Sequence, residues 1–403
     1  MVNSIKSFTH RQLLFFPFFF VLYEMISFLS NDAYLPAMPL IQDALHTTDD
    51  LVRLSLTSWF FGGCLIQLAI GPLSDYFGRR KIMLLGGIVF VISSIGCALS
   101  THINMLIFMR LIEGSTIATM AVSGYATIHE MYDTKKSIQI LAFMNSISVL
   151  APALGPLVGA LILMYQPWPI IFYGLGFSAI IPLLLLYWDM PETAPIKQGS
   201  LNFKAICGRY KRIMLNRSFV IYMLSSRTLF SALIVWLSAG PFLLSTAFNM
   251  DPIHFGYAQT FIFGAFIVGT RANKALMERF DLSIILWQGW AACILGAIYC
   301  LIYAGLNINN FYPILPGLML ITFGSGISLP IYSRLAIESS NEPMGEKVAM
   351  TTFSMTLFGT LATLIINMTF TDSLWSIALI LAGFIFSGFI LFSVSHKLGW
   401  INQ

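Results

Sequence analysis

Residues 71–81 read GPLSDYFGRRK, a short polar segment that separates two long apolar blocks at 54–73 and 82–100. Each block has about 20 residues, which is the length that a helix needs to cross a bilayer. The polar segment is too short to form a domain of its own. It therefore predicts a tight turn between two membrane-spanning helices.

This turn combines residue types that a simple basic loop does not require. Gly71 and Gly78 permit a tight turn and a close approach of neighbouring helices. Asp75 lies at a helix end, where it can engage Arg79 or the N-terminus of another helix. Positive charge at a membrane surface would explain Arg79 and Arg80. It would not explain the two glycines and the acid together.

The apolar pattern extends along the whole chain. Its 403 residues are 57% hydrophobic and only 10% charged, and the mean hydropathy is +0.79. Soluble domains carry roughly 25% charged residues, so the composition excludes a soluble globular protein. We predict an all-α membrane protein whose twelve transmembrane helices correspond to the blocks at 13–35, 54–73, 82–100, 105–127, 138–164, 168–188, 218–247, 255–276, 283–304, 311–336, 347–370 and 373–395.

Basic residues mark one side of the predicted membrane. With an even number of spans both termini share a side, and all but three of the 22 Lys and Arg residues fall on or near it. The exceptions are Arg53, placed in an opposite loop, and Arg110 and Arg227, inside apolar blocks. The positive-inside rule assigns the basic side, and thus both termini, to the cytoplasm. Nucleic-acid binding is the weaker interpretation, because the basic loops are short and follow the topology.

One long hydrophilic stretch, 189–217, divides the chain into two sets of six blocks. We predict an N-terminal six-helix bundle over 1–188, a cytoplasmic linker, and a C-terminal six-helix bundle over 218–403. Transporters commonly have this arrangement of two halves. The remaining loops are too short to hold a sensory or catalytic domain.

The sequence offers no chemistry typical of an enzyme. Five cysteines are scattered without a CxxC pair, and the histidines lack the spacing of metal ligands, so we expect no disulfide framework and no metal site. We also find no nucleophile–base arrangement. The first block contains Glu24 and Asp32 and exceeds the usual apolar core of a signal peptide, so we interpret it as a helix.

Four ionisable residues interrupt the first and fourth blocks: Glu24, Asp32, Arg110 and Glu113. Charge in a hydrocarbon core is costly and normally faces a partner or a water-filled cavity. A rise of ~1.5 Å per residue places Asp32 and Arg110 at similar depths, and Glu24 is about 80° around the helix from Asp32, so one cavity can take both acids. A static ion pair would explain one acid beside Arg110. Three acids exceed that need and favour proton or cation coupling.

Arg227 lies about half-way through the seventh block, and two interpretations of it stay open. It can be a counter-ion for Glu24 or Glu113 that holds the halves together, or it can contact an anionic or polar part of a substrate. Small-molecule sites are mostly apolar with a few polar groups. The candidate lining residues, most of which could instead face lipid or pack, are Tyr23, Phe28, Trp59, Phe60, Met144, Arg227, Trp236 and Phe261.

A second motif, APALGPLVGA at 151–160, spaces small and kinking residues three or four positions apart: Pro152, Gly155, Pro156 and Gly159. They form a smooth stripe on which another helix can pack closely. Ordinary small-residue packing is the alternative. The stripe resembles the antiporter motif of twelve-span drug/proton antiporters, in which it faces the other half and limits leak. Likewise, GPLSDYFGRRK resembles the cytoplasmic loop signature of the major facilitator superfamily, which clamps the outward-facing state.

Three further segments strengthen this resemblance: LYE at 22–24, NDAYLPAMPLI at 31–41 and RLIEG at 110–114. They are similar to the MdfA-type and Bcr/CflA-type drug/proton antiporters. The resemblance implies a major facilitator fold in a bacterial inner membrane. It matches Glu24 and Asp32 to two cavity acids that bind protons and drugs in competition, and Arg110 to the coupling arginine. Glu113 departs from the usual Gln, and Arg227 departs from a small or apolar residue.

We therefore expect a proton-coupled exporter of small amphipathic molecules, drugs among them, that works by alternating access as a monomer in lipid. Protons are the coupling ion, and we expect no other cofactor and no nucleic-acid partner. A proton that neutralises Asp32 or Glu24 would weaken pairing with Arg110 and let the halves rock, provided that ligands bind the two states differently. Export of an endogenous metabolite or siderophore and proton-coupled uptake by symport remain the alternatives.

Overall fold

The computed structural model describes residues 8–194, 203–306, 308, 310–342, 344–371 and 373–400, and no strand occurs in these ranges. The N-terminal helices are α1 (His10–Asp32), η1 (Leu35–Ala37), α2 (Met38–Ala44), α3 (Asp49–Phe77), α4 (Arg79–Ala98), α5 (Ile103–Thr119), η2 (Met120–Gly124), α6 (Tyr125–Met131), α7 (Thr134–Leu163) and α8 (Pro169–Asp189). The others are α9 (Phe203–Leu215), α10 (Arg217–Phe242), η3 (Leu243–Ala247), α11 (Pro252–Leu276), α12 (Leu282–Gly305), η4 (Tyr312–Ile314), α13 (Leu315–Glu338), α14 (Met344–Thr369) and α15 (Leu374–Lys397).

The predicted transmembrane helices are confirmed as long apolar helices. Within the described residues, eleven helices or continuous helical runs are long and apolar enough to cross a bilayer, for example Ile103–Met131, in which η2 joins α5 to α6. The twelfth long helix is α7, whose segment Leu150–Leu163 is also apolar. The chain is a multi-pass membrane protein.

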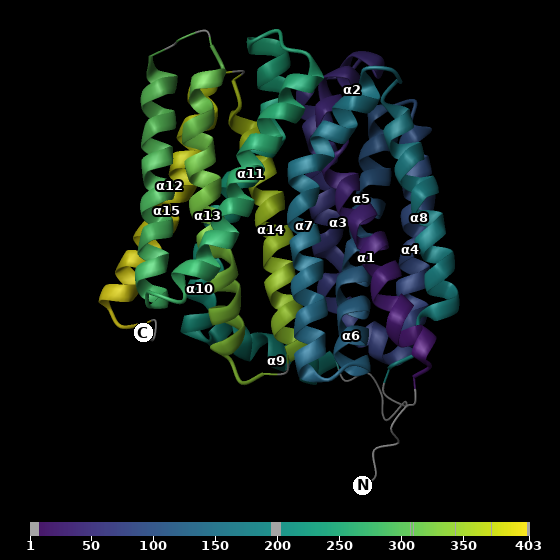
Figure 1. Ribbon diagram of the computed structural model, residues 1–403. Coiled ribbons are helices and arrows are strands. Elements are labelled where there is room, and N and C mark those ends of the chain that lie inside the picture. The colour runs from purple at the N-terminus through teal and green to yellow at the C-terminus, as the bar shows by residue number, and fades with distance from the viewer. Residues whose placement is uncertain are drawn as a thin grey trace.

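The helices form two groups that lie side by side, with α1–α8 on one side and α10–α15 on the other (Figure 1). The start of α1 and the end of α15 lie at the same end of the molecule, which we call the terminal face; the opposite end is the distal face. The two groups meet where α3 contacts α14 and where α7 contacts α11. We call these two contacts the seam.

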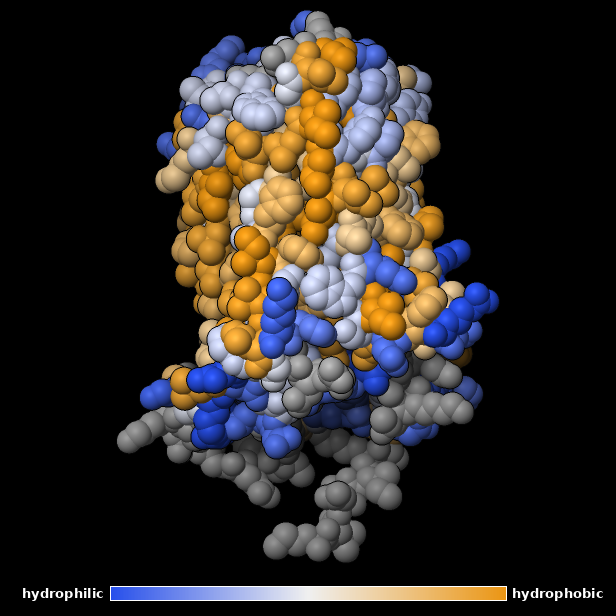
Figure 2. Space-filling model, turned by 90° about the vertical axis from the view of Figure 1, so that its left-hand side faces the viewer, coloured by the Kyte–Doolittle hydropathy of each residue, from blue (hydrophilic) through white to orange (hydrophobic). Residues whose placement is uncertain are grey.

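The surface matches a protein embedded in a bilayer. Orange, apolar side chains cover the middle of the molecule in Figure 2, whereas blue, hydrophilic side chains gather towards the terminal face. Apolar side chains on the outside of a membrane protein are covered by lipid, so this band is where the bilayer lies.

The described part of the predicted linker contains an amphipathic helix, α9, at the terminal face. Arg209 of α9 lies 2.6 Å from Glu346 of α14, and the Tyr210 hydroxyl donates to the Leu68 carbonyl of α3 at 3.4 Å. The linker helix thus contacts both groups. Arg212 hydrogen-bonds Glu342 and lowers the pKa of that carboxyl group. Residues 195–202 of the linker, and 1–7 and 401–403 of the predicted bundles, lie outside the described residues.

Candidate functional site

A buried ion pair lies on α5 within the N-terminal group. The Arg110 Nη1 atom is 2.6 Å from Glu113 Oε2, and neither side chain is exposed. Glu113 also accepts a hydrogen bond of 2.6 Å from the Ser94 hydroxyl of α4. The expectation that Arg110 pairs with Asp32 or Glu24 is therefore wrong. Residues three apart share one helix face, so Glu113 reaches the guanidinium first.

Arg110 is also held by α1 and by aromatic rings. Its Nη1 donates to the Ser30 carbonyl at 3.0 Å, which confirms that α5 and α1 meet at this depth. The guanidinium carbon lies 4.2 Å from the centre of the Tyr34 ring, with the rings of Trp59 and Phe172 at 5.7 and 5.9 Å. Among the described residues, Nε and Nη2 have no hydrogen-bond partner. These two nitrogen atoms of Arg110 can therefore donate hydrogen bonds to a ligand, or to another side chain after a rearrangement.

Asp32 is the last residue of α1 and is only 3% exposed. Its Oδ1 accepts a hydrogen bond of 3.1 Å from the Asn31 side chain. Arg110 acts on it electrostatically, but no ion pair forms with Asp32 in the described part of the chain. A Cβ on Gly155 would lie 2.7 Å from the Asp32 Cβ, so α7 can approach this acid only through glycine. Asp32 is thus a buried carboxyl group without a direct counter-ion.

Glu24 lies two turns nearer the terminal face and is completely buried. Its Oε1 accepts a hydrogen bond from the Tyr125 hydroxyl. Tyr125 follows directly on η2, a π-helical segment at Met120–Gly124. Such segments are rare and are frequently found at functional sites. Neither Tyr125 nor Ser94 was predicted from the sequence, because each reaches its acid from another helix.

The turn at 71–81 forms an ion network at the terminal face. The Arg79 Nη2 atom lies 3.1 Å from Asp75 Oδ1, as predicted, and 2.7 Å from Glu130 Oε1. The N-terminus of α4 is occupied by Glu192, whose Oε1 accepts from the Arg79 backbone N–H at 2.9 Å. Arg80 donates to the Tyr187 carbonyl. All these partners belong to the N-terminal group, so the turn ties α3, α4, α6 and the end of α8 together.

The two glycines of this turn have different roles. Gly78 has a φ of +106°, which side-chain-bearing residues rarely adopt, so the sharp turn needs glycine here. Gly71 lies within α3, and a Cβ there would be 3.9 Å from the nearest Val122 atom. The prediction that Gly71 is needed for a tight turn or close helix contact is therefore wrong.

The stripe at 151–160 packs against two different helices. Gly155 and Gly159 face α1, where a Cβ on Gly159 would overlap the Ala33 carbonyl. The neighbouring side of α7 meets α11: the Thr260 hydroxyl donates to the Ala153 carbonyl at 3.0 Å, and Pro156 lies against Gly256. The expected contact with the other half is thus made by Ala153 and Pro156, and not by Gly155 or Gly159.

Most of the predicted lining residues are buried. The side chains with at most 6% exposure are Tyr23, Trp59, Phe60, Met144, Arg227 and Trp236, and Phe28 is partly buried. Trp236 donates to Gln259 at 2.8 Å and stacks on Phe311 within the C-terminal group.

Phe261 does not belong to this set. It is 60% exposed, because it lies two residues, or about 200°, around α11 from the inward-facing Gln259. The prediction that Phe261 lines a substrate cavity is wrong.

Arg227 is the only buried charged side chain that the structure describes in residues 218–400. Its Nε donates to the Ser354 hydroxyl at 2.9 Å and its Nη2 to the Thr351 carbonyl at 3.1 Å, both on α14. No described carboxylate pairs with it. Of the two interpretations left open by the sequence, the counter-ion to Glu24 or Glu113 is therefore wrong.

Arg53 joins the two groups near the distal face, a role that the sequence did not predict. It lies in the second turn of α3 rather than in a loop, and it is 2% exposed. Its guanidinium carbon is 5.1 Å from the ring centre of Phe242 and 4.9 Å from that of Phe370, both in the C-terminal group. Its Nε donates to the Asn367 side chain at 3.2 Å. At the distal end of the seam, the two groups are therefore in contact through the Arg53 side chain.

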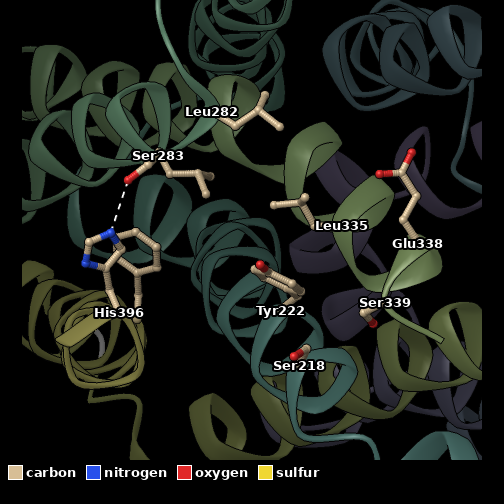
Figure 3. A pocket seen from close by; sticks show the side chains of 10 residues that line it. Ser218, Tyr222, Leu282, Ser283, Leu335, Glu338, Ser339 and His396 are labelled. Carbon is tan, nitrogen blue, oxygen red and sulfur yellow. Dashed lines mark hydrogen bonds between the residues drawn. The ribbon is translucent and has the colours of Figure 1, made fainter. Parts of the chain in front are cut away.

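A cavity of about 270 Å³ lies away from these residues, near the terminal face of the C-terminal group. Ser283 and His396, which hydrogen-bond each other at 3.2 Å, line one side, and Tyr222, Leu335 and Glu338 line the rest (Figure 3). None of the predicted site residues lines it. We therefore do not place the substrate site there.

Comparison with protein families gives one match across most of the chain. The family model described as "Major Facilitator Superfamily" matches residues 20–365. The chain is 30% identical over 396 residues to the multidrug transporter MdfA of Yersinia pestis bv. Antiqua (strain Angola), which covers 97% of this chain and 93% of that protein. It is also 30% identical over 350 residues to the multidrug transporter MdfA of Escherichia coli O6:H1, covering 86% of this chain and 85% of that protein.

Two solved structures share the fold. A bacterial homologue of the human lysosomal transporter Spinster, solved in an inward-facing and unoccupied conformation, aligns with a TM-score of 0.72 at 11% identity, covering 98% of this chain and 97% of that one. A D-xylose-proton symporter aligns with a TM-score of 0.72 at 14% identity, covering 93% and 96% of the two chains. At such identities the likeness concerns the arrangement of the helices.

Proposed function

Because this chain belongs to the major facilitator superfamily and is a transporter rather than an enzyme, we propose that it exports small amphipathic molecules, drugs among them, in exchange for protons. It works by alternating access in a bacterial inner membrane, with both termini cytoplasmic and the bundles 1–188 and 218–403 rocking about the seam. It acts as a monomer in lipid and uses protons without another cofactor. The names of its full-length relatives support the substrate class.

The observation that carries this proposal is the buried carboxyl group of Asp32, which lacks a direct counter-ion. A carboxylate in an apolar interior is costly unless it is paired. Asp32 therefore gains from binding either a proton or a cationic ligand, and these two compete for one site. Glu24, which accepts a hydrogen bond from Tyr125, is the second buried acid on α1.

The Arg110–Glu113 ion pair determines the net charge beside Asp32 during this exchange. Because Glu113 already neutralises Arg110, protonation of Asp32 does not leave the guanidinium without an ion partner. Arg110 can then turn its remaining Nε and Nη2 donors towards Asp32 when that acid is ionised. The close packing of Gly155 on Asp32 links such a change to α7, and α7 contacts the other bundle through α11.

Export of an endogenous anionic metabolite or a siderophore is the second candidate, and the lack of a described acid that pairs with Arg227 favours it. It uses the same proton exchange at Asp32 and Glu24 and differs only in the substrate. An uptake symporter has less support, because the multidrug relatives match nearly the whole chain.

The test is proton release from detergent-solubilised protein in weak buffer when a cationic drug is added. We expect the parent protein to release protons, and Asp32→Asn and Glu24→Gln each to release fewer. Asp43→Asn, which changes an exposed acid of α2, is the matched control and should behave like the parent. Equal release from all four proteins would contradict the assignment of Asp32 and Glu24.

A further inference from the structure

The buried positive charge of Arg227 in the C-terminal bundle has no described counter-ion. It is 4% exposed, and its hydrogen bonds go to a hydroxyl and a carbonyl, which are neutral groups. A buried charge is normally paired with an opposite charge or lies beside a water-filled path. No described acid pairs with Arg227, so an anionic group of a ligand is a candidate for its counter-charge.

The guanidinium still has donors to offer. It carries five N–H groups in a planar fork, and the described contacts use one on Nε and one on Nη2. The N–H groups of Nη1 therefore remain, together with the second one on Nη2. This edge of the fork matches the two oxygens of a carboxylate, which arginine binds in a bidentate and charge-assisted manner. Ser354 and Thr351 of α14 hold the other edge in place.

Arg227 lies beside the seam rather than deep inside its own bundle. One turn further along α10, the Phe230 ring contacts the Phe60 ring of α3, with centres 6.4 Å apart. On α14, the Thr356 side chain lies against Gly63 of α3. A ligand bound between α3 and α10 at this point would lie one turn from Arg227 along α10. At ~1.5 Å per residue, Arg227 is roughly 15 Å and Glu24 roughly 21 Å above the starts of their helices, so their depths are similar.

The two bundles bury different charges. Glu24, Asp32 and Glu113 outnumber Arg110 on α1 and α5, whereas Arg227 is the one charged side chain buried in the described part of the C-terminal bundle. A molecule with a cationic and an anionic end fits this arrangement in one orientation, with the amine towards the acids and the carboxylate towards the arginine. A molecule with only a cationic end leaves Arg227 without a counter-ion.

We propose that Arg227 is a carboxylate-binding site, and that the preferred substrates are zwitterions whose amine and carboxylate are held apart by an apolar frame. This inference rests on the proposed function, because it assumes a ligand between the two bundles. It adds that the C-terminal bundle selects the anionic end of the substrate.

Rhodamine 110 and rhodamine 123 provide a matched test. They share one cationic ring system, but the first carries a free carboxylate and the second carries its methyl ester. Binding to detergent-solubilised protein can be followed by fluorescence anisotropy. We expect the parent protein to bind the acid at least about tenfold more tightly than the ester, since a hydrogen-bonded ion pair is the only difference. Arg227→Gln should remove this preference while binding the ester as well as the parent does.

Two variants separate a binding role from a structural one. Arg227→Lys keeps the charge without the planar fork and should retain a reduced preference for the acid. Arg217→Gln removes an exposed arginine at the start of the same helix and should leave the preference unchanged. If Arg227→Gln weakens the binding of acid and ester equally, or leaves their ratio unchanged, the carboxylate site is refuted while the proposed export function stands. If neither dye binds the parent protein, the proposed function fails, and this inference fails with it.

Discussion

The two six-helix bundles share one architecture but differ in the charge that they bury. In the N-terminal bundle, three acids and Arg110 lie on α1 and α5, with hydroxyl donors from Ser94 and Tyr125. In the C-terminal bundle, the described helices bury a single charge, Arg227, held by neutral groups. The similar fold of the bundles therefore does not dictate their chemistry. One bundle has groups that can exchange a proton, and the other has a fixed cation, because an arginine stays charged throughout the physiological pH range.

The two ends of the seam differ in a similar way. At the distal face Arg53 is buried between aromatic rings of the other bundle. At the terminal face the links across the two bundles run through α9 and its more exposed ion pairs. Exposed ion pairs contribute little to stability, whereas buried contacts contribute more. We infer that the terminal end opens at a lower cost.

The largest expected effect comes from breaking the buried pair of the N-terminal bundle. Glu113→Ala leaves Arg110 without an ion partner, which should lower the free energy of unfolding by roughly 3–5 kcal/mol. In the C-terminal bundle, Ser354→Ala removes a neutral acceptor from Arg227 and should cost about 1.5–3 kcal/mol. Unfolding by SDS in mixed micelles measures both. Equal losses would mean that the two arginines are held alike, contrary to the comparison.

A smaller effect is expected where α7 approaches Asp32. Gly155→Ala places a methyl group 2.7 Å from the Asp32 Cβ, and such overpacking costs about 1–3 kcal/mol. Gly264→Ala on α11 has no atom within 4 Å of the added Cβ, so it is the control and should be neutral or slightly stabilising. The same micelle titration applies. If Gly155→Ala keeps the stability and the proton release of the parent protein, the packing of α7 on Asp32 is not coupled to proton exchange.

The distal contact should give an intermediate to small effect. Arg53→Leu removes the guanidinium from Phe242 and Phe370, where cation–π contacts contribute about 0.5–2 kcal/mol each, and also from its partly exposed ion pairs with Asp49 and Asp50, which contribute little. We expect lower stability and faster labelling of a cysteine introduced at Ala239, which is buried on α10. Labelling at an unchanged rate would indicate that Arg53 does not close the distal end.

The smallest effect is expected for the ion network of the turn. Glu130→Gln removes one of the two acids that contact Arg79, and because this pair is partly exposed the loss should be within about 1 kcal/mol. Transport in proteoliposomes is the more sensitive measurement, since the network joins four helices at the terminal face. A loss of stability as large as that of Glu113→Ala would contradict our expectation that the partly exposed ion pairs at the terminal face contribute less than the buried Arg110–Glu113 pair.

The long helices and their buried charges could be predicted from the sequence, because bilayer thickness fixes the length of an apolar block and the cost of charge singles out Glu24, Asp32, Arg110 and Glu113. Their pairing could not. Depth along a helix follows from residue number, but the direction of a side chain depends on neighbouring helices. The spacing of Arg110 and Glu113 by three residues was the available signal for their pairing.

Rotation about the helix axis explains the other errors. Phe261 was placed inside although it faces outward, because large apolar residues occur on both the buried and the exposed side of α11 and do not mark its inner face. One of the two open interpretations of Arg227 gave it a partner in the other bundle, but its bonds go to α14. Glu192 reaches the N-terminus of α4 from far along the chain, and no local pattern could have revealed this.

The account depends most on protons being exchanged in the N-terminal bundle alone, and the pH dependence of rhodamine 123 binding tests this directly. Protons and a cationic dye compete for the acids, so its affinity should rise with pH in the parent protein. This slope should flatten in Asp32→Asn and persist in Arg227→Gln. A slope that persists in Asp32→Asn and Glu24→Gln but disappears in Arg227→Gln would contradict the division of roles between the two bundles.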